Sequence, residues 1–391
     1  MKAKIWKLLS LISIMIFALS IAASVHAASL TTTITLNNGP YGVAYDSTMH
    51  EVFVANSIAG NLQVISDSTN AVVQTVTGLS ATPLGLAYDS AKGEIFVTET
   101  NNVDVVSDSS NTVIASIPLT GAGGSTSVAY DSGKGELFVP LTNSIAVISD
   151  SSNTVVANIT LTGVGCVAYD SSKGEIFATE ENENVEPLVL DVVAISDSTN
   201  SVVATIPVST ELWSVVYDHG KGEVFALSRP GTLSVISDSS NKVVATISNL
   251  NVNIFSPMVY DSGKGEIYIN NGNLVQVVSD STNQLVQTLD DNGATYTYLG
   301  IAYDSGTGTI YAVSNGGPDG IPGSLAVISD ASSGTSTTSP TSTASPKAST
   351  TATSTPKVPE FSNAALPLIA AAMAAVTLSA VALSRKKTTR K

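Results

Sequence analysis

Five aromatic residues of this 391-residue chain stand outside its repeating pattern and could form a ligand site. They are Tyr41, Trp213, Phe255, Tyr296 and Tyr298. Each precedes an expected strand of a repeating unit, where we predict that the connecting loops open at one face of the molecule. Aromatic planes bind sugar rings by stacking and bind cations through the ring face. These residues therefore predict a platform for a saccharide or a cationic ligand.

Charged residues are expected in loops at the same face. One inserted loop carries Glu180, Glu181 and Glu183, and Arg229 lies in a loop of the next unit. Carboxylate and guanidinium groups would add charge-assisted hydrogen bonds to a ligand stacked on the aromatic platform. The alternative is that the aromatic residues pack between repeats and that the glutamates form a solvated loop.

Groups suited to nucleophilic, redox or transition-metal chemistry are sparse. The single cysteine, Cys166, stands where other repeats place a small residue, and His50 and His219 fall in units that lie nearly opposite each other. Neither a bound transition metal nor a Ser-His-Asp arrangement is expected from such separated residues. We therefore predict no catalytic residues, no metal site and no cofactor, with Ca²⁺ or Mg²⁺ at an acidic mouth left as a possibility.

Two dipeptides recur along the chain and define the repeat. Successive tyrosines of a Tyr-Asp pair are 43, 42, 39, 48, 43 and 43 residues apart, the length of one four-stranded propeller blade. A Ser-Asp pair follows each Tyr-Asp pair. The tyrosines are Tyr45, Tyr88, Tyr130, Tyr169, Tyr217, Tyr260 and Tyr303. The Ser-Asp aspartates are Asp67, Asp108, Asp150, Asp197, Asp238, Asp280 and Asp330. Their predicted role is turn formation, because Asp bonds readily to its own backbone.

Each repeat contains four short runs rich in Val, Ile, Phe and Tyr. In the second repeat these runs are 85–89, 93–99, 102–108 and 111–117, separated by Gly, Ser, Asn and Asp. The runs are nearly continuous, as expected if neighbouring blades cover both faces of each sheet. The seventh repeat supplies only three strands, and residues 31–36 match a fourth. We therefore predict an all-β, seven-bladed β-propeller over residues 28–330, closed by its N-terminal strand.

The flanking segments predict where the protein is found. Residues 1–27 combine lysines, an apolar stretch and a small-residue cleavage site, as in a signal peptide. Residues 331–357 are rich in Ser, Thr and Pro and predict an extended stalk. Residues 358–391 contain Pro359-Glu360-Phe361, an apolar segment and a basic tail. They predict a transmembrane helix that anchors the propeller at the extracellular face of the membrane.

The repeat resembles the YVTN-type propeller repeat of archaeal surface-layer and secreted proteins, with IFVTE at 95–99 as the nearest match. The tail is similar to the PEF-type sorting signal of archaea. That resemblance implies cleavage near Pro359, Glu360 and Phe361 by an archaeosortase and attachment of a lipid. A plain single-span anchor is the alternative. The propeller family implies a fold and no single chemistry.

Charge restricts the class of partner. Residues 30–330 carry seven Lys and Arg against 31 Asp and Glu, a net charge of −24. This sign argues against a nucleic-acid partner. We expect a binding, adhesion or envelope-structural module whose partner is an envelope glycan or a surface protein. The alternatives are a metal-dependent hydrolase or lyase, because lactonase-like propellers share the fold, and a structural filler without a ligand. Asn158, in the sequon Asn158-Ile159-Thr160, is the candidate glycosylation site.

Overall fold

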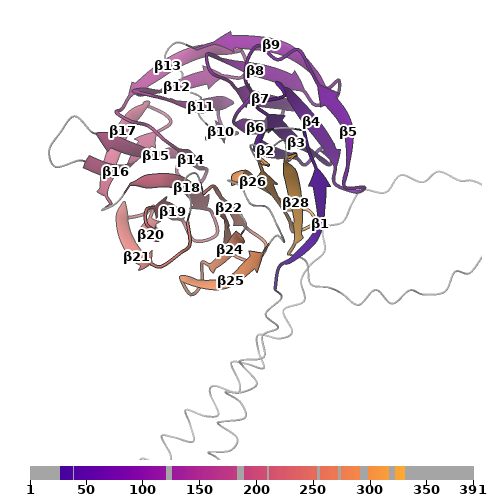
Figure 1. Cartoon of the computed structure of the whole chain (residues 1–391). Helices are drawn as coiled ribbons and strands as arrows, with labels where there is room; N and C mark the ends of the chain where they lie inside the picture. Colours follow the sequence, from indigo (N-terminus) through magenta and orange to yellow (C-terminus); the bar gives the residue numbers. More distant parts are fainter. Residues whose placement is uncertain are drawn as a thin grey trace, which may run out of the picture. The chain divides into compact units, whose positions relative to one another are not determined.

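The strands of the protein form a ring of seven blades (Figure 1). The computed structural model describes residues 27–37, 39–119, 126–182, 189–208, 211–252, 256–271, 274–290, 298–316 and 322–330. These residues contain 28 strands in seven four-stranded antiparallel sheets and no helix. The chain is therefore a seven-bladed all-β propeller, which confirms the predicted fold class.

Each blade is an antiparallel meander whose first strand lies at the central channel and whose fourth lies at the rim (Figure 1). Blade 1 contains β2 (Pro40–Asp46), β3 (Glu51–Asn56), β4 (Asn61–Ser66) and β5 (Ala71–Val76). Blade 2 contains β6 (Leu86–Asp89), β7 (Glu94–Thr98), β8 (Asn102–Ser107) and β9 (Thr112–Pro118). Blade 3 contains β10 (Ala129–Asp131), β11 (Glu136–Leu141), β12 (Ser144–Ser149) and β13 (Thr154–Thr160). Blade 4 contains β14 (Val167–Asp170), β15 (Glu175–Asn182), β16 (Val189–Ser196) and β17 (Ser201–Pro207). Blade 5 contains β18 (Leu212–Asp218), β19 (Glu223–Ser228), β20 (Thr232–Ser237) and β21 (Lys242–Ile247). Blade 6 contains β22 (Met258–Asp261), β23 (Glu266–Asn271), β24 (Leu274–Ser279) and β25 (Gln284–Asp290).

Blade 7 is completed by the N-terminal strand, as predicted. It contains β26 (Tyr298–Asp304), β27 (Thr309–Ser314), β28 (Ser324–Ser329) and β1 (Ser29–Thr35). Strand β1 pairs antiparallel with β28, with Ile34 opposite Leu325. The two ends of the ring are thereby joined in one sheet, and β1 covers the edge that β28 would otherwise leave unpaired.

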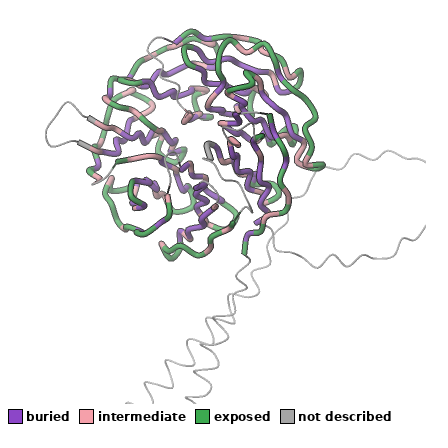
Figure 2. The backbone as a smooth tube through the Cα atoms, viewed as in Figure 1, coloured by how far each residue is buried: buried purple, intermediate pink, exposed green. Residues whose placement is uncertain are grey.

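Burial is greatest in the second and third strands of each blade and falls sharply at the rim (Figure 2). The middle of the second and third strands is buried on both faces, as in β3 and β4. The fourth strands instead alternate or face solvent, and β5 is exposed at every position except Val76. The expectation that neighbouring blades cover whole sheets is therefore wrong for the fourth strands. Blades diverge toward the rim of a ring, so neighbouring sheets cover the inner strands of a blade and leave its fourth strand exposed.

The Tyr-Asp aspartates and the repeated asparagines form the predicted turns. The Ser-Asp aspartates instead have contacts such as those of Asp150, which accepts the Tyr130 hydroxyl at 2.8 Å and pairs with Lys92 of the preceding blade. Oδ1 of Asp46 accepts the backbone N–H groups of Thr48 and Met49 at 2.7 and 3.0 Å. The turn between the third and fourth strands places Asn111 at φ 53°, a left-handed conformation that Asn adopts more readily than most residues. Local side-chain chemistry thus sets the hairpins of each blade.

The predicted signal peptide, stalk and anchor lie outside the described residues, except for Ala27. The same is true of the sorting motif Pro359, Glu360 and Phe361. The described part of the chain contains no helix of the length and apolarity needed to cross a bilayer.

Candidate functional site at the channel mouth

A cavity of about 710 Å³ lies at the end of the central channel where the first strands begin. All seven blades contribute to its lining, because the start of each first strand points toward the axis. The lining residues are Tyr41, Gly42, Val43, Leu86, Thr126, Ser127, Val128, Val164, Gly165, Cys166, Val167, Glu211, Leu212, Trp213, Ser214, Val215, Arg229, Pro257, Met258, Gly300 and Ile301. Tyr41, Trp213 and Arg229 of the predicted platform thus share one cavity.

Trp213, Arg229 and Glu211 form a connected group at this cavity. The Arg229 guanidinium lies 5.2 Å from the centroid of the Trp213 ring, a cation–π contact. Its Nη1 lies 3.6 Å from Oε2 of Glu211, and the Arg229 N–H donates to the Glu211 carbonyl at 2.9 Å. The two charged side chains are 55% and 46% exposed. A ligand in the cavity therefore meets a guanidinium that is held in place and still open to solvent.

Irregular strand starts position the aromatic residues. The register between β18 and β19 shifts between Leu212 and Ser214, which leaves Trp213 out of the ladder. A similar shift in β2 spans Pro40 to Val43 and includes Tyr41. Such bulges redirect side chains at the ends of strands. Burial raises the pKa of Tyr41. As a tyrosine, it can donate a hydrogen bond to a ligand in the cavity.

The other residues predicted to bind a ligand are not among the described residues that line the cavity. Glu180 and Glu181 lie on β15 and do not line the cavity, and Oε1 of Glu180 accepts the Thr162 N–H at 3.3 Å. Tyr298 begins β26, but its side chain lies outside the described residues. Also outside them are Phe255, Tyr296 and Glu183. The contribution of these residues to binding stays a prediction.

Cys166 joins the cavity to the neighbouring blade. Its Sγ donates to the carbonyl oxygen of Trp213 at 3.0 Å and so links blade 4 to blade 5. Burial raises the pKa of the thiol to about 11, so the thiolate is scarce at neutral pH. No histidine is present among the described residues that line the cavity. These side chains suit binding through aromatic, guanidinium and hydroxyl groups.

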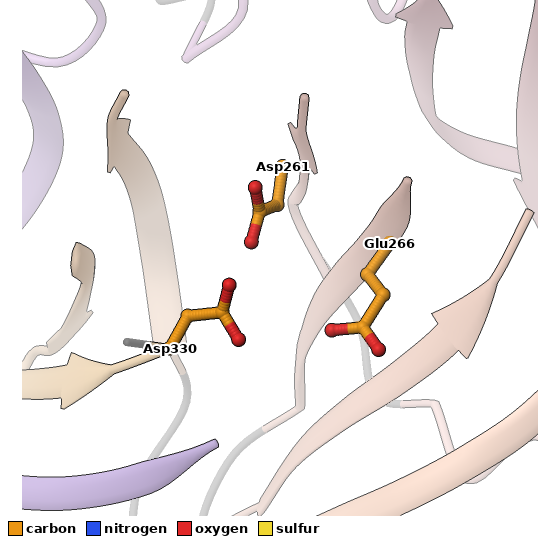
Figure 3. Close-up of side chains that lie close together, drawn as sticks. All are labelled: Asp261, Glu266 and Asp330. Carbon is orange, nitrogen blue, oxygen red and sulfur yellow. The ribbon is translucent and has the colours of Figure 1, made fainter. Parts of the chain in front are cut away.

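A second concentration of charge lies between blades 6 and 7 (Figure 3). Asp261 and Glu266 of blade 6 face Asp330 of blade 7, with one oxygen of each within 4.8 Å of the others. The Lys264 ammonium donates to Asp330. Burial, followed by the neighbouring Asp261, raises the pKa of Asp330 to about 7. The three carboxylates resemble the oxygen ligands of a hard cation, but a lysine already neutralises part of their charge.

A lysine–aspartate ion pair recurs at five of the seven blade junctions and is a feature that sequence reasoning missed. At each of these five junctions, one blade supplies a lysine three residues after its Tyr-Asp aspartate and a glutamate five residues after it. The next blade supplies its Ser-Asp aspartate. Lysine reaches that aspartate in five junctions: Lys92–Asp150 at 3.1 Å, Lys134–Asp197 at 3.0 Å, Lys173–Asp238 and Lys221–Asp280 at 3.6 Å, and Lys264–Asp330. The fixed position of this lysine in the repeat was the available signal.

Asn158 lies on β13, the rim strand of blade 3, and is exposed. A glycan on its side chain would extend into solvent without displacing a packed residue. Whether the residue is modified stays a prediction.

Comparison with known proteins identifies the fold and not the family. No protein-family model matches the chain, and no curated protein matches it. Among solved structures, the chain is similar to the hydrazine synthase of Kuenenia stuttgartiensis, with a TM-score of 0.60 and 16% sequence identity. The match covers 71% of this chain and 92% of that chain. At this identity the similarity concerns the fold alone.

Proposed function

We propose that the protein is a non-catalytic recognition module of the cell envelope that binds a glycan at the channel mouth. One observation carries this proposal: Trp213, Arg229 and Glu211 form a connected, partly exposed group at a cavity of about 710 Å³. A sugar ring fits against the aromatic groups, and Arg229 donates to a hydroxyl or carboxylate of the sugar.

The sequence outside the propeller supports a location at the cell surface. The signal-like residues 1–27, the stalk-like residues 331–357 and the anchor-like residues 358–391 together describe a secreted ring held at the membrane by its C-terminus. The resemblance to YVTN-type repeats and to the PEF-type signal supports an archaeal surface protein. On this proposal the net charge of −24 over residues 30–330 keeps the exposed ring soluble.

Tryptophan fluorescence tests the proposal directly. The chain has two tryptophans, Trp6 and Trp213, so a full-length Trp6→Phe protein reports on the cavity alone. Titration with glycans released from envelope preparations should change the Trp213 emission saturably. Arg229→Ala should weaken binding by about tenfold or more, since a hydrogen bond to a charged group contributes about 1.5–3 kcal/mol. Lys242→Met, on the exposed rim strand β21, is the matched control.

The possible results separate the alternatives. Saturable binding that survives Arg229→Ala and a Trp213→Ala/Phe255→Ala double substitution in a folded protein would overturn the assignment of the site. The absence of binding to any fraction would favour a structural filler. Metal-dependent turnover of a lactone by the same preparation would favour the hydrolase or lyase alternative and overturn the non-catalytic proposal.

A further inference from the structure

Arg229 is the only Lys or Arg among the described residues that line the channel-mouth cavity. Residues 30–330 contain seven Lys and Arg in all. Five of them are the turn lysines, which pair with aspartates of neighbouring blades. Lys242 lies at the start of the exposed rim strand β21. An anionic group that enters the cavity therefore has one cationic partner, Arg229.

The turn that carries Arg229 is held in place by its surroundings. It joins β19 to β20, and across it the Ser228 hydroxyl donates to the Thr232 carbonyl oxygen at 3.0 Å. The Leu250 N–H donates to the Gly231 carbonyl oxygen at 3.0 Å. Gly231 has φ 117°, and a Cβ at this position would collide with the Leu250 carbonyl oxygen, so the turn requires glycine. The backbone at Arg229 is thus fixed before a ligand binds, which lowers the entropy cost of binding.

The Arg229 guanidinium has donors to spare. Its contacts within the described part of the chain are the Trp213 ring, whose centroid lies 5.2 Å from Cζ, and the Glu211 carboxylate at 3.6 Å. The distance to Glu211 is longer than a normal hydrogen bond, and an ion pair between exposed side chains contributes little. A guanidinium presents five N–H donors in a plane and binds a carboxylate through two parallel hydrogen bonds. Arg229 therefore has room for a second, better placed carboxylate.

We propose that the glycan bound at the channel mouth contains a hexuronate, and that the carboxylate of this sugar binds Arg229 in place of Glu211. The inference rests on the proposed function of the same site. Glu211 is 46% exposed, so water can hydrate its carboxylate once the ligand displaces it. A cationic ligand would be repelled by Arg229, and a neutral sugar would offer only hydroxyl acceptors, which bind a guanidinium less strongly than a carboxylate does.

The net charge of −24 over residues 30–330 is compatible with an acidic ligand. Glu211 is the only Asp or Glu among the lining residues that the structure describes. The Tyr-Asp and Ser-Asp aspartates lie in or beside the turns between strands and do not line the cavity. Salt screens exposed charges that lie more than about 8 Å apart at physiological ionic strength. Distant carboxylates therefore slow the approach of an acidic glycan, and the contact with Arg229 decides its affinity.

Chemical reduction of the glycan tests the inference. Glycans released from envelope preparations are titrated into the full-length Trp6→Phe protein at pH 7, before and after reduction of their carboxyl groups to alcohols, with Trp213 emission as the signal. The acidic glycans should bind at least about tenfold more tightly than the reduced glycans. Arg229→Lys keeps the charge but loses the planar donor set, so it should weaken binding of the acidic glycans about tenfold and that of the reduced glycans little. Added salt should weaken only the acidic interaction.

Glu211→Gln should have the opposite effect. It removes the competing carboxylate and should tighten binding of the acidic glycans by about threefold, without changing that of the reduced glycans. Asp290→Asn, at the end of the rim strand β25, removes the same charge away from the cavity and is the matched control. Equal binding of acidic and reduced glycans would overturn the hexuronate and leave the glycan site, as would equal affinities of Glu211→Gln and Asp290→Asn for the acidic glycans. The absence of saturable binding by either preparation would overturn the proposed function as well.

Discussion

At the scale of single residues, the turn lysine present in five of the seven blades pairs with an aspartate of the next blade. Lys264 is 26% exposed, but its partner Asp330 is only 4% exposed and lies beside the buried Asp261. Burial of like charges is unfavourable unless a cation accompanies them. The lysine therefore makes a set of buried carboxylates compatible with a packed blade interface.

Removing that lysine tests its role in stability. Lys264→Met should lower the free energy of unfolding by about 1–3 kcal/mol, because it removes the ammonium that donates to a buried carboxylate beside another carboxylate. Urea unfolding at pH 7 measures the change. Lys242→Met, on the exposed rim, should change the free energy by no more than about 0.5 kcal/mol. Equal losses in the two variants would argue against a specific contribution of the acid cluster.

At the scale of strands, the closing strand β1 and the irregular first strands have different roles. Strand β1 completes blade 7 through its pairing with β28, and Ile34 packs in a cluster with Val43 and Leu325. The register shifts in β2 and β18 instead turn Tyr41 and Trp213 out of the ladder at the cavity. Regular pairing thus closes the ring, and local departures from it build the candidate site.

Ile34 tests the closure. Ile34→Ala should destabilise the protein by about 2–5 kcal/mol, as expected for a large-to-small change at a buried position. Thr33→Ala, at the adjacent exposed position of β1, should have little effect. Thermal unfolding followed by circular dichroism compares the two proteins. If both variants melt with the wild type, β1 does not contribute to the stability of the ring.

At the scale of the whole molecule, buried carboxyl groups with raised pKa values make the stability of the propeller depend on pH. Burial raises the pKa of Glu99 to about 7, with Asp104 adding to the effect. Burial and Asp261 raise that of Asp330 to about 7. In the unfolded chain such groups titrate near pH 4. The native state therefore binds more protons than the unfolded state between about pH 4 and pH 7.

The sign of the pH dependence follows from this difference. Because the native state holds the additional protons, stability falls as the pH rises from about 4 to about 7. The thermal midpoint should be higher at pH 5 than at pH 8, as measured by calorimetry at constant ionic strength. Asp330→Asn and Glu99→Gln should flatten the dependence. A midpoint that rises toward pH 8 would contradict the assignment of these raised pKa values.

The amino-acid sequence by itself determined the number of blades, the hairpin turns and the closure by residues near 31–36. These features depend on contacts between neighbours in the chain, such as Asp46 with Thr48 and Met49, or on a pattern repeated seven times. It also placed Tyr41, Trp213 and Arg229 among the candidate binding residues, because they depart from that pattern.

Only the tertiary structure decided which side chains meet. The bond between Lys264 and Asp330 joins residues 66 positions apart, and the Cys166 contact with Trp213 joins residues 47 apart. Such pairs depend on the angle and offset between whole blades, which no local pattern encodes. For the same reason, the sequence did not reveal the consequence of having Met49 at this position of the repeat. The ring shows that it leaves the junction between blades 1 and 2 without a lysine.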